Sequence, residues 1–219
     1  MRVVGGSSRG RVIRAPAGTG TRPTSDRVRE AIFDVLSNLV ELDGASVADL
    51  FAGSGAMGIE ALSRGAEAAV FVDTDRAALE AVRSNLRSAG LEAAAASIVR
   101  ADVLTWLSRK APTGESRTRA PGRPGPFDLA LCDPPYAFSR WRLLLEKLDA
   151  TVAVLESDRP LEVPTRWDVV RQKGYGGTLV TVVSAAREQR SGGSHDDDAV
   201  RGRFADLFTS SDTDQEGVS

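Results

Sequence analysis

Short apolar runs alternate with helically spaced apolar positions over most of this chain. Five runs have the composition of buried strands: SVADLF, AAVFVD, SIVRAD, FDLALCD and TVAVLES, at residues 46–51, 68–73, 97–102, 127–133 and 151–157. Each of the first four is followed by a segment with the spacing of an amphipathic helix. This alternation predicts an α/β fold with a doubly wound, mostly parallel sheet and helices on both faces.

Two further regions are typical of antiparallel pairs. WDVVRQKG and TLVTVVS, at residues 167–174 and 178–184, flank a Tyr-Gly-Gly turn and predict an antiparallel C-terminal hairpin, which brings the sheet to seven strands. RVVGGSSRGRVIRAP, at residues 2–16, has two short β-prone runs around a Gly/Ser turn. We therefore also expect a small N-terminal β-hairpin with arginines along it.

Apolar side chains at helical spacing predict a helix after this hairpin. They are Val28, Ala31, Ile32, Val35, Leu36, Leu39 and Val40. Thr24 or Ser25 is suited to cap the helix, and Asp26 falls in its first turn, where the helix dipole favours an acid.

Two segments have little to bury. Residues 111–126 are rich in Pro, Gly and Arg and predict a mobile loop, whereas residues 188–219 are polar and acidic and predict a disordered tail. We therefore expect an arginine-rich N-terminal extension at residues 1–22, an α/β domain at residues 23–187 and the tail.

The composition excludes several kinds of site. A single cysteine, Cys132, excludes a disulfide framework and a cysteine-based zinc cluster, and we expect no metal. The single histidine, His195, lies in the polar tail, so histidine-dependent catalysis is not expected. No apolar run has membrane-spanning length and no signal-peptide pattern is present, which predicts a cytoplasmic protein without a membrane partner.

A glycine-rich loop follows the first strand of the alternating pattern. Gly53, Gly55 and Gly58 form G-x-G-x-x-G between a predicted strand and helix, a pattern that lets a ligand approach the backbone closely. We expect the loop to bind a cofactor through Phe51, Ala52, Gly53, Ser54, Gly55 and Gly58. Asp73, 20 residues past Gly53, can accept from a ribose diol. A nicotinamide dinucleotide fits these features as well as any other adenosine cofactor.

Further acids at strand ends favour one of these cofactors. Asp49 precedes the loop, Asp102 ends the third strand and is placed to accept from an adenine amine, and the fourth strand ends in Asp133. Carboxylates at successive strand ends suit a cationic ligand and would repel a pyrophosphate. The pattern therefore favours S-adenosylmethionine.

Asp133, Pro134, Pro135 and Tyr136 form a stiff corner after the fourth strand. The prolines cannot donate to a sheet, so this segment must lie at or past the strand end. In open α/β sheets the carboxyl edge is where ligands bind.

The combination of motifs resembles a known family. GGSSRGR, RPTSDRVREAIFDVL, DLFAGSGAMGIEALSRGA and CDPPY occur in the order found in the bacterial methyltransferases that modify N2 of a guanine in 16S ribosomal RNA. The resemblance covers residues 2 to about 185. It implies a Rossmann-like class I fold, S-adenosylmethionine as cofactor, and 16S rRNA or a small-subunit assembly particle as partner. We expect a monomer.

The resemblance also implies roles for the Asp-Pro-Pro-Tyr corner. The Asp133 carboxylate and the Pro134 carbonyl would accept N–H bonds from the guanine amine and localise its lone pair. Pro135 would keep these acceptors rigid, and Tyr136 would stack on the base.

A net charge of −2 conceals a cluster of seven arginines in the first thirty residues. Such a cluster favours nucleic-acid binding, and in the resembled family this region meets RNA and closes over the site. The implied phosphate contacts are Arg9, Arg11 and Arg14, and the implied lid residues are Thr24, Asp26 and Arg27.

Three alternatives remain open at this point. A nicotinamide-dependent oxidoreductase shares the glycine pattern, a non-catalytic RNA-binding module would share the arginines, and amino methyltransferases acting on DNA adenine carry similar tetrapeptides. Other residues have structural interpretations: Cys132, Trp106 and Trp141 as core, Asp75 as a helix cap, and Arg83 and Asn85 as a solvated helix face.

Overall fold

The computed structural model describes residues 1–16, 25–92, 94–109 and 125–186. Within it, Met1–Ala186 forms one compact unit. Thr24, the acidic tail and all but the last two residues of the expected mobile loop lie outside the described ranges.

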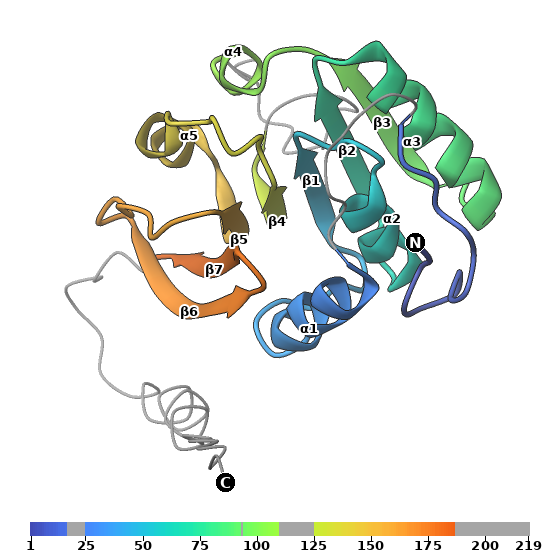
Figure 1. Ribbon diagram of the computed structural model, residues 1–219, viewed down its shortest axis with the longest axis horizontal. Coiled ribbons are helices and arrows are strands. Elements are labelled where there is room, and N and C mark those ends of the chain that lie inside the picture. Colours follow the sequence, from blue (N-terminus) through green and yellow to red (C-terminus); the bar gives the residue numbers. More distant parts are fainter. Residues whose placement is uncertain (17–24, 93, 110–124, 187–219) are drawn as a thin grey trace, which may run out of the picture. The chain divides into compact units, whose positions relative to one another are not determined.

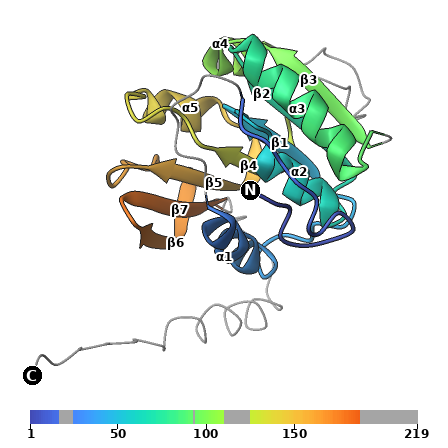
Figure 2. The same cartoon turned by 45° about the vertical axis from the view of Figure 1, so that its right-hand side comes forward.

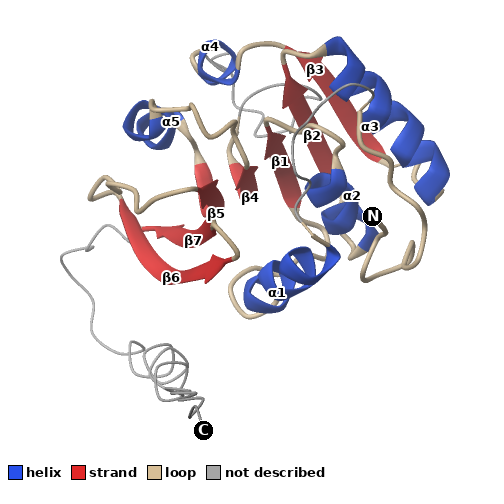
Figure 3. Ribbon diagram, in the orientation of Figure 1, coloured by secondary structure: helices blue, strands red, loops and turns tan. Residues whose placement is uncertain are grey.

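One mixed sheet organises the unit (Figures 1 and 3), in the order β3-β2-β1-β4-β5-β7-β6. Its strands are β1 (Ser46–Leu50), β2 (Ala68–Asp73), β3 (Ala95–Arg100), β4 (Phe127–Cys132), β5 (Ala150–Ser157), β6 (Trp167–Tyr175) and β7 (Thr178–Ala185). Strands β1 to β5 pair in parallel, while β7 is antiparallel to both β5 and β6. This confirms the predicted sheet, whose order reverses between β1 and β4, where doubly wound folds bind ligands.

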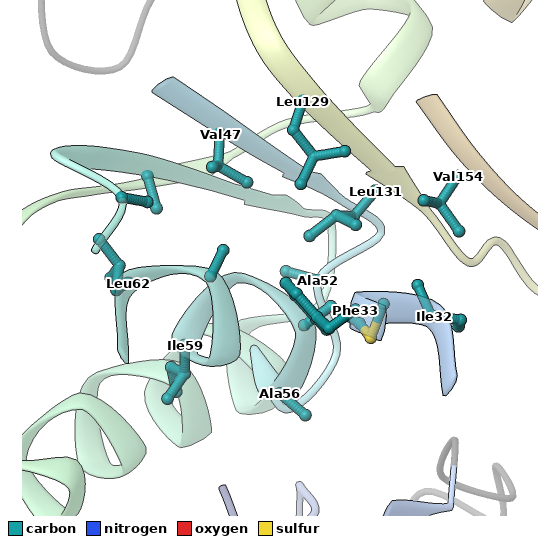
Figure 4. Packing of buried hydrophobic residues seen from close by; sticks show 14 of the residues in the cluster. Ile32, Phe33, Val47, Ala52, Ala56, Ile59, Leu62, Leu129, Leu131 and Val154 are labelled. Carbon is teal, nitrogen blue, oxygen red and sulfur yellow. The ribbon is translucent and has the colours of Figure 1, made fainter. Parts of the chain in front are cut away.

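Helices cover both faces of the sheet. They are α1 (Asp26–Leu36), α2 (Ala56–Ser63), α3 (Arg76–Ala89), α4 (Val103–Leu107) and α5 (Trp141–Lys147). One hydrophobic cluster joins α1, α2 and α3 to the sheet, and the other joins α4 and α5 to its opposite face. Figure 4 shows Ile32 and Phe33 of α1 facing Leu131 of β4 and Val154 of β5. No helix within the described ranges is long and apolar enough to cross a membrane.

The strands alternate between the two clusters. Val47 and Leu129 belong to the first cluster, whereas their neighbours Ala48 and Ala130 belong to the second, as the period of two requires. Cys132 is buried in the second cluster, and burial raises the pKa of its thiol. Its assignment to the core is therefore confirmed, as it is for Trp106 and Trp141, which lie in the same cluster.

The N-terminal segment, which we define as residues 1–16, departs from the predicted hairpin. It doubles back and pairs briefly, since the Val3 N–H donates to the Arg11 carbonyl at 2.9 Å and the Ile13 N–H to the Met1 carbonyl at 3.0 Å. The only antiparallel bridge within the segment is Arg2 with Val12, however, and no regular strand forms within it. Its turn is bonded to α2 instead, since the Ser7 N–H donates to the Ser63 carbonyl at 2.7 Å. A Cβ on Gly6 would lie 1.8 Å from that carbonyl oxygen, so this docking requires glycine. The two arms of the segment are thus paired to each other, while N–H groups of its turn hold it on α2.

Helix α1 differs from its prediction in length and in the face it buries. Ser25 is the N-cap, accepting from the Val28 N–H, and the helix ends at Leu36 rather than continuing to Val40. The buried face comprises Arg29, Ile32, Phe33 and Leu36. The Arg29 side chain is 0% exposed and forms ion pairs with Asp26 and the equally buried Glu60. One of the seven clustered arginines therefore has a structural role, and the basic surface is smaller than the sequence suggested.

Candidate functional site

Asp49, Asp73 and Asp133 lie at or just past the carboxyl ends of β1, β2 and β4, and β1 lies between the other two strands in the sheet (Figure 1). Asp49 of β1 lies opposite Phe71 and Leu131 in the two neighbouring strands. Asp73 and Asp133 come two residues after these partners, so the strand period places both on the Asp49 face. The three carboxylates therefore approach one another, although they come from separate parts of the sequence.

The glycine loop leaves β1 in an unusual backbone conformation. Gly53 and Gly55 have φ values of 52° and 75°, and Phe51 has φ 64°, which is rare for a residue with a side chain. Such conformations cluster at functional sites, where the surrounding structure enforces them. At the start of α2 a Cβ on Gly58 would lie 2.4 Å from the Phe71 ring. Gly58 is thus required for the packing of α2 on β2.

Asp73 holds this loop against the end of β2. One carboxylate oxygen accepts from the Gly53 N–H at 2.9 Å, and the other accepts from the Asp75 N–H at 2.9 Å. A carboxylate has about four acceptor positions, so both oxygens retain capacity for ligand hydroxyls. Asp75 caps α3, as expected, by accepting from the Ala77 N–H.

Asp49 is the buried acid of the site. It is 4% exposed and accepts from the Gly58 N–H at 2.9 Å. Its pKa is raised to about 8, chiefly by burial and to a smaller extent by the charges of Asp133 and Asp73, while the Gly58 hydrogen bond opposes this rise. The site thus has a negative electrostatic potential. A cation bound beside Asp49 would favour the deprotonated, charged form of its carboxyl group.

Asp102 is placed differently from its prediction. The strand β3 ends at Arg100, and Asp102 caps α4, accepting from the Thr105 N–H at 2.9 Å and from its hydroxyl at 2.8 Å. These bonds lower the Asp102 pKa, with a smaller contribution from Arg140, whose guanidinium lies 3.8 Å away. The Ala101 N–H donates to the Asp73 carbonyl at 3.0 Å, so Asp102 still lies at the same sheet edge.

The Asp-Pro-Pro-Tyr corner projects from the end of β4. Asp133 is exposed and Pro134 is buried, while the Phe138 N–H donates to the Pro135 carbonyl at 2.8 Å and closes the turn. The Tyr136 side chain is 57% exposed, and its hydroxyl lies 3.3 Å from Thr178 Oγ1 at the start of β7. The ring is therefore held at the surface by a contact from another part of the sheet.

An aromatic row joins the corner to the glycine loop. The Phe138 ring packs edge-on against Phe51, with centroids 5.2 Å apart, and against Trp141 at 5.4 Å. Sequence reasoning did not single out Thr178. Nothing local distinguishes Thr178, because its neighbour Tyr136 is 42 residues away in sequence.

The residues assigned to RNA fall into two groups. Arg9, Arg11 and Arg14 are exposed on the N-terminal segment, and Arg27 is exposed on α1. Asp26 is committed to structure, since its carboxylate accepts from the Arg2 N–H at 3.2 Å and from Arg29 at 2.8 Å. Burial alone would raise the Asp26 pKa, but these hydrogen bonds outweigh it and lower the pKa.

Comparisons with known proteins agree with this geometry. Residues 1–184 match the sequence model of the family described as "Conserved hypothetical protein 95". The chain belongs to this family. It is 41% identical over 192 residues to "Putative rRNA methyltransferase YlbH" of Bacillus subtilis (strain 168), covering 83% of this chain and 97% of that protein.

Two further relatives extend the comparison. "Ribosomal RNA small subunit methyltransferase D" of Escherichia coli (strain K12) is 33% identical over 189 residues, covering 80% of this chain and 85% of that protein. The solved structure described as "Putative methyltransferase yhhF from Escherichia coli" has a TM-score of 0.70 at 30% identity, covering 86% of this chain and 99% of that chain. The family resemblance and the class I methyltransferase fold expected from the motifs are therefore confirmed.

One residue of this family member was misinterpreted from its sequence. Asn85 was assigned to a solvated face of α3, but it is 1% exposed. It shares the inner face of the helix with Val82, Leu86 and Ala89, which are all buried. Helical spacing from these apolar residues could have revealed its burial, but a polar side chain there was taken as a sign of exposure. Among the described residues, no group of three or more His, Cys, Asp or Glu side chains is arranged to hold a metal ion.

Proposed function

We propose that this protein transfers a methyl group from S-adenosylmethionine to the exocyclic N2 amine of a guanine in 16S rRNA. The observation that carries the proposal is the convergence of Asp49, Asp73 and the Asp-Pro-Pro-Tyr corner at one sheet edge beside the glycine loop. The names of the relatives support ribosomal RNA as the methyl acceptor.

The chemistry of the donor set fits this cofactor. The charges of Asp73 and Asp133 raise the pKa of the buried Asp49, so this group of carboxylates suits a ligand with positive charge and would repel a pyrophosphate. Asp49 would face the ammonium end, Asp73 the ribose hydroxyls and Asp102 the adenine amine. Residues 51–55 and Gly58 would supply the close backbone approach. When bound, S-adenosylmethionine supplies a methyl group activated by the adjacent sulfonium charge.

The corner would act on the acceptor base. The guanine amine is a weak nucleophile because its lone pair is delocalised into the ring. The Asp133 carboxylate and the Pro134 carbonyl would accept its two N–H bonds, localise the lone pair and stabilise the positive charge that develops on nitrogen. Tyr136 is exposed at the surface and would stack on the extruded base. Pro135 would keep the two acceptors in place.

The exposed arginines would hold the RNA backbone. Arg9, Arg11, Arg14 and Arg27 are available for phosphate contacts, which require no base specificity. Thr24 and Asp26 would help to shape the lid over the site. Asp26 also keeps the N-terminal segment attached to α1, because its carboxylate accepts from the Arg2 N–H. We expect the N-terminal extension at residues 1–22 to carry most of this RNA surface.

The test is transfer of labelled methyl to small ribosomal subunits from cells that lack this enzyme, followed by nucleoside analysis. We expect label in N2-methylguanosine of 16S rRNA with the wild-type chain. As a matched control, Asp168→Ala removes an exposed acid from β6 and should leave the transfer unchanged. Label in N6-methyladenosine, or transfer to DNA alone, would show that the corner serves a different amine. Absence of transfer to any nucleic acid would overturn the proposal.

A further inference from the structure

The Asn85 carboxamide forms hydrogen bonds to two segments that are far apart in the sequence, the glycine loop and the N-terminal segment. Its Nδ2 donates to the Ser54 carbonyl at 2.9 Å and to the Arg14 carbonyl at 2.8 Å. Its Oδ1 accepts from the Arg14 N–H at 3.0 Å. Ser54 lies in the glycine loop, while Arg14 lies in the N-terminal segment, 40 residues earlier in the chain. One side chain therefore holds the backbone of both.

This side chain has no donor to spare. A primary amide has two N–H donors, and both are used on backbone carbonyls of different segments. Asn85 is 1% exposed, so solvent is a poor substitute for a lost partner. An unpaired buried donor weakens a structure by more than a typical hydrogen bond strengthens it. If either segment moves away, the other loses a well-formed attachment.

Asn85 adds an attachment at the far end of the N-terminal segment, next to Ile13, which is buried in the core. The beginning of the segment is fixed to α2, because the Val4 and Gly5 N–H groups each donate to Glu60 at 2.8 Å. The stretch from Arg9 to Val12 is exposed. Beyond it, Asn85 binds both the N–H and the carbonyl of Arg14, much as a neighbouring strand would. Figure 2 shows the N-terminal trace running beside α2 and α3.

We propose that Asn85 is a positioning residue that couples the cofactor loop to the arginine-bearing N-terminal segment. Occupation of the loop orders the Ser54 carbonyl, and this favours the Asn85 orientation that also holds Arg14. By thermodynamic linkage, ordering of the segment by RNA must strengthen cofactor binding by the same factor. The identity of these two ligands rests on the proposed function, but the coupling between loop and segment does not.

Hydrogen exchange with S-adenosylhomocysteine as the probe tests the coupling without RNA. In the wild-type chain we expect saturating probe to slow exchange in peptides covering residues 51–58 and, about five-fold or more, in peptides covering residues 9–16. Asn85→Asp matches the size of Asn85 and keeps an acceptor for the Arg14 N–H, but it removes both donors. In this variant the slowing at residues 9–16 should disappear, and the probe should bind about ten-fold more weakly.

Two controls separate coupling from general damage. Arg83→Ala changes an exposed side chain of α3 and should retain the wild-type response. Peptides from β4 and β5 report whether Asn85→Asp keeps the folded core. Arg14→Pro removes the donated N–H from the other side, without altering α3, and should also abolish the transmitted slowing.

The outcomes distinguish this proposal from the proposed function. Slowing confined to residues 51–58 in the wild-type chain, or a full response in Asn85→Asp, would overturn the coupling. If the probe does not bind, the assigned cofactor is wrong, and the coupling is then read in the ligand-free protein. In the ligand-free protein, Arg14→Pro should accelerate hydrogen exchange at residues 51–58. Unchanged exchange at these residues would refute the coupling.

Discussion

The proposed cofactor side and the proposed acceptor side of this site hold their acids in different ways. On the cofactor side, Asp49 and Asp73 accept backbone N–H groups of α2 and of the glycine loop, so each carboxylate is also part of the fold. On the acceptor side, Asp133 and Tyr136 are exposed, and two prolines stiffen the backbone that carries them. We therefore expect changes on the cofactor side to alter both stability and cofactor binding, and changes on the acceptor side to alter turnover or KM for the RNA substrate while stability and cofactor binding are kept.

Asp133→Ala is the sharpest test of this difference. It should lower single-turnover methyl transfer by about 10²–10³-fold, because the variant lacks an acceptor for the developing positive charge. Thermal stability should be unchanged, and S-adenosylhomocysteine affinity should stay within a few-fold of wild type. Single-turnover rates, calorimetry and thermal melting give the three readouts. A variant that keeps its rate would show that Asp133 does not act on the amine.

Asp73→Ala should affect both properties. It removes the acceptor for the Gly53 and Asp75 N–H groups and, under the proposed function, the contact to the ribose hydroxyls. We expect cofactor binding to weaken by about 1.5–3 kcal/mol and the melting temperature to fall. Asp75→Ala is the matched control, since it removes the α3 cap and should lower stability with little effect on the cofactor. Loss of affinity without loss of stability would contradict the dual role of Asp73.

The raised pKa of Asp49 predicts a pH dependence specific to the cofactor side. Its folded pKa of about 8 lies above the ordinary value of 3.8. Between these two pH values the folded ligand-free protein keeps the Asp49 proton, whereas the unfolded chain has released it. This contribution to stability is fully present below pH 4 and is lost as the pH rises towards about 8. A cationic ligand favours the carboxylate, and its affinity should therefore rise with pH in the upper part of this range.

Calorimetry at pH 6.5 and 8.5 measures that rise. We expect binding of S-adenosylhomocysteine, which keeps the ammonium group, to tighten about ten-fold and to release a proton at the lower pH. Asn at position 49 cannot titrate, so Asp49→Asn should show neither effect. An equal pH dependence in Asp49→Asn would assign the titration to another group.

The salt dependence of RNA binding tests the arginine surface of the N-terminal segment. Arg9→Gln and Arg11→Gln should each reduce the slope of log affinity against log salt by about one, if each arginine neutralises a phosphate. These substitutions are preferable to deletion of the N-terminal segment, because Val3 and Ile13 belong to the hydrophobic core. Glu30→Gln on α1 is a control that should not reduce the slope. An unchanged slope in both arginine variants would move the RNA surface elsewhere.

The features predicted correctly are those that short stretches of sequence encode. Apolar runs and turn residues placed every strand of the sheet, and the chain order then brought Asp49, Asp73 and Asp133 to one edge. These acids could be assigned together because the carboxyl ends of parallel strands must meet there.

The features that were missed depend on contacts between distant segments. Arg29 was counted in the arginine cluster expected to bind nucleic acid and Asn85 was assigned to a solvated helix face, yet each lies on a buried helix face and has a partner from a distant part of the chain. Glu60 is similar, since it is buried among apolar residues of α2 and accepts from the N-terminal segment. A buried polar side chain needs partners, and sequence periodicity does not reveal whether the fold supplies them.

The contact between Tyr136 and Thr178 predicts the smallest effect and the most local one. The hydroxyl pair lies at the surface, so its net contribution is that of one exposed hydrogen bond. Thr178→Val keeps the side-chain shape and removes the partner, which should let the Tyr136 ring move and raise KM for the RNA substrate about two- to five-fold. Cofactor affinity should not change. Thr178→Val and Tyr136→Phe both break the same contact. The double variant should therefore raise KM for the RNA substrate no more than either single variant does. Fully additive effects would show that Thr178 acts on the substrate independently of the ring, and the corner would then be positioned by its prolines without help from β7.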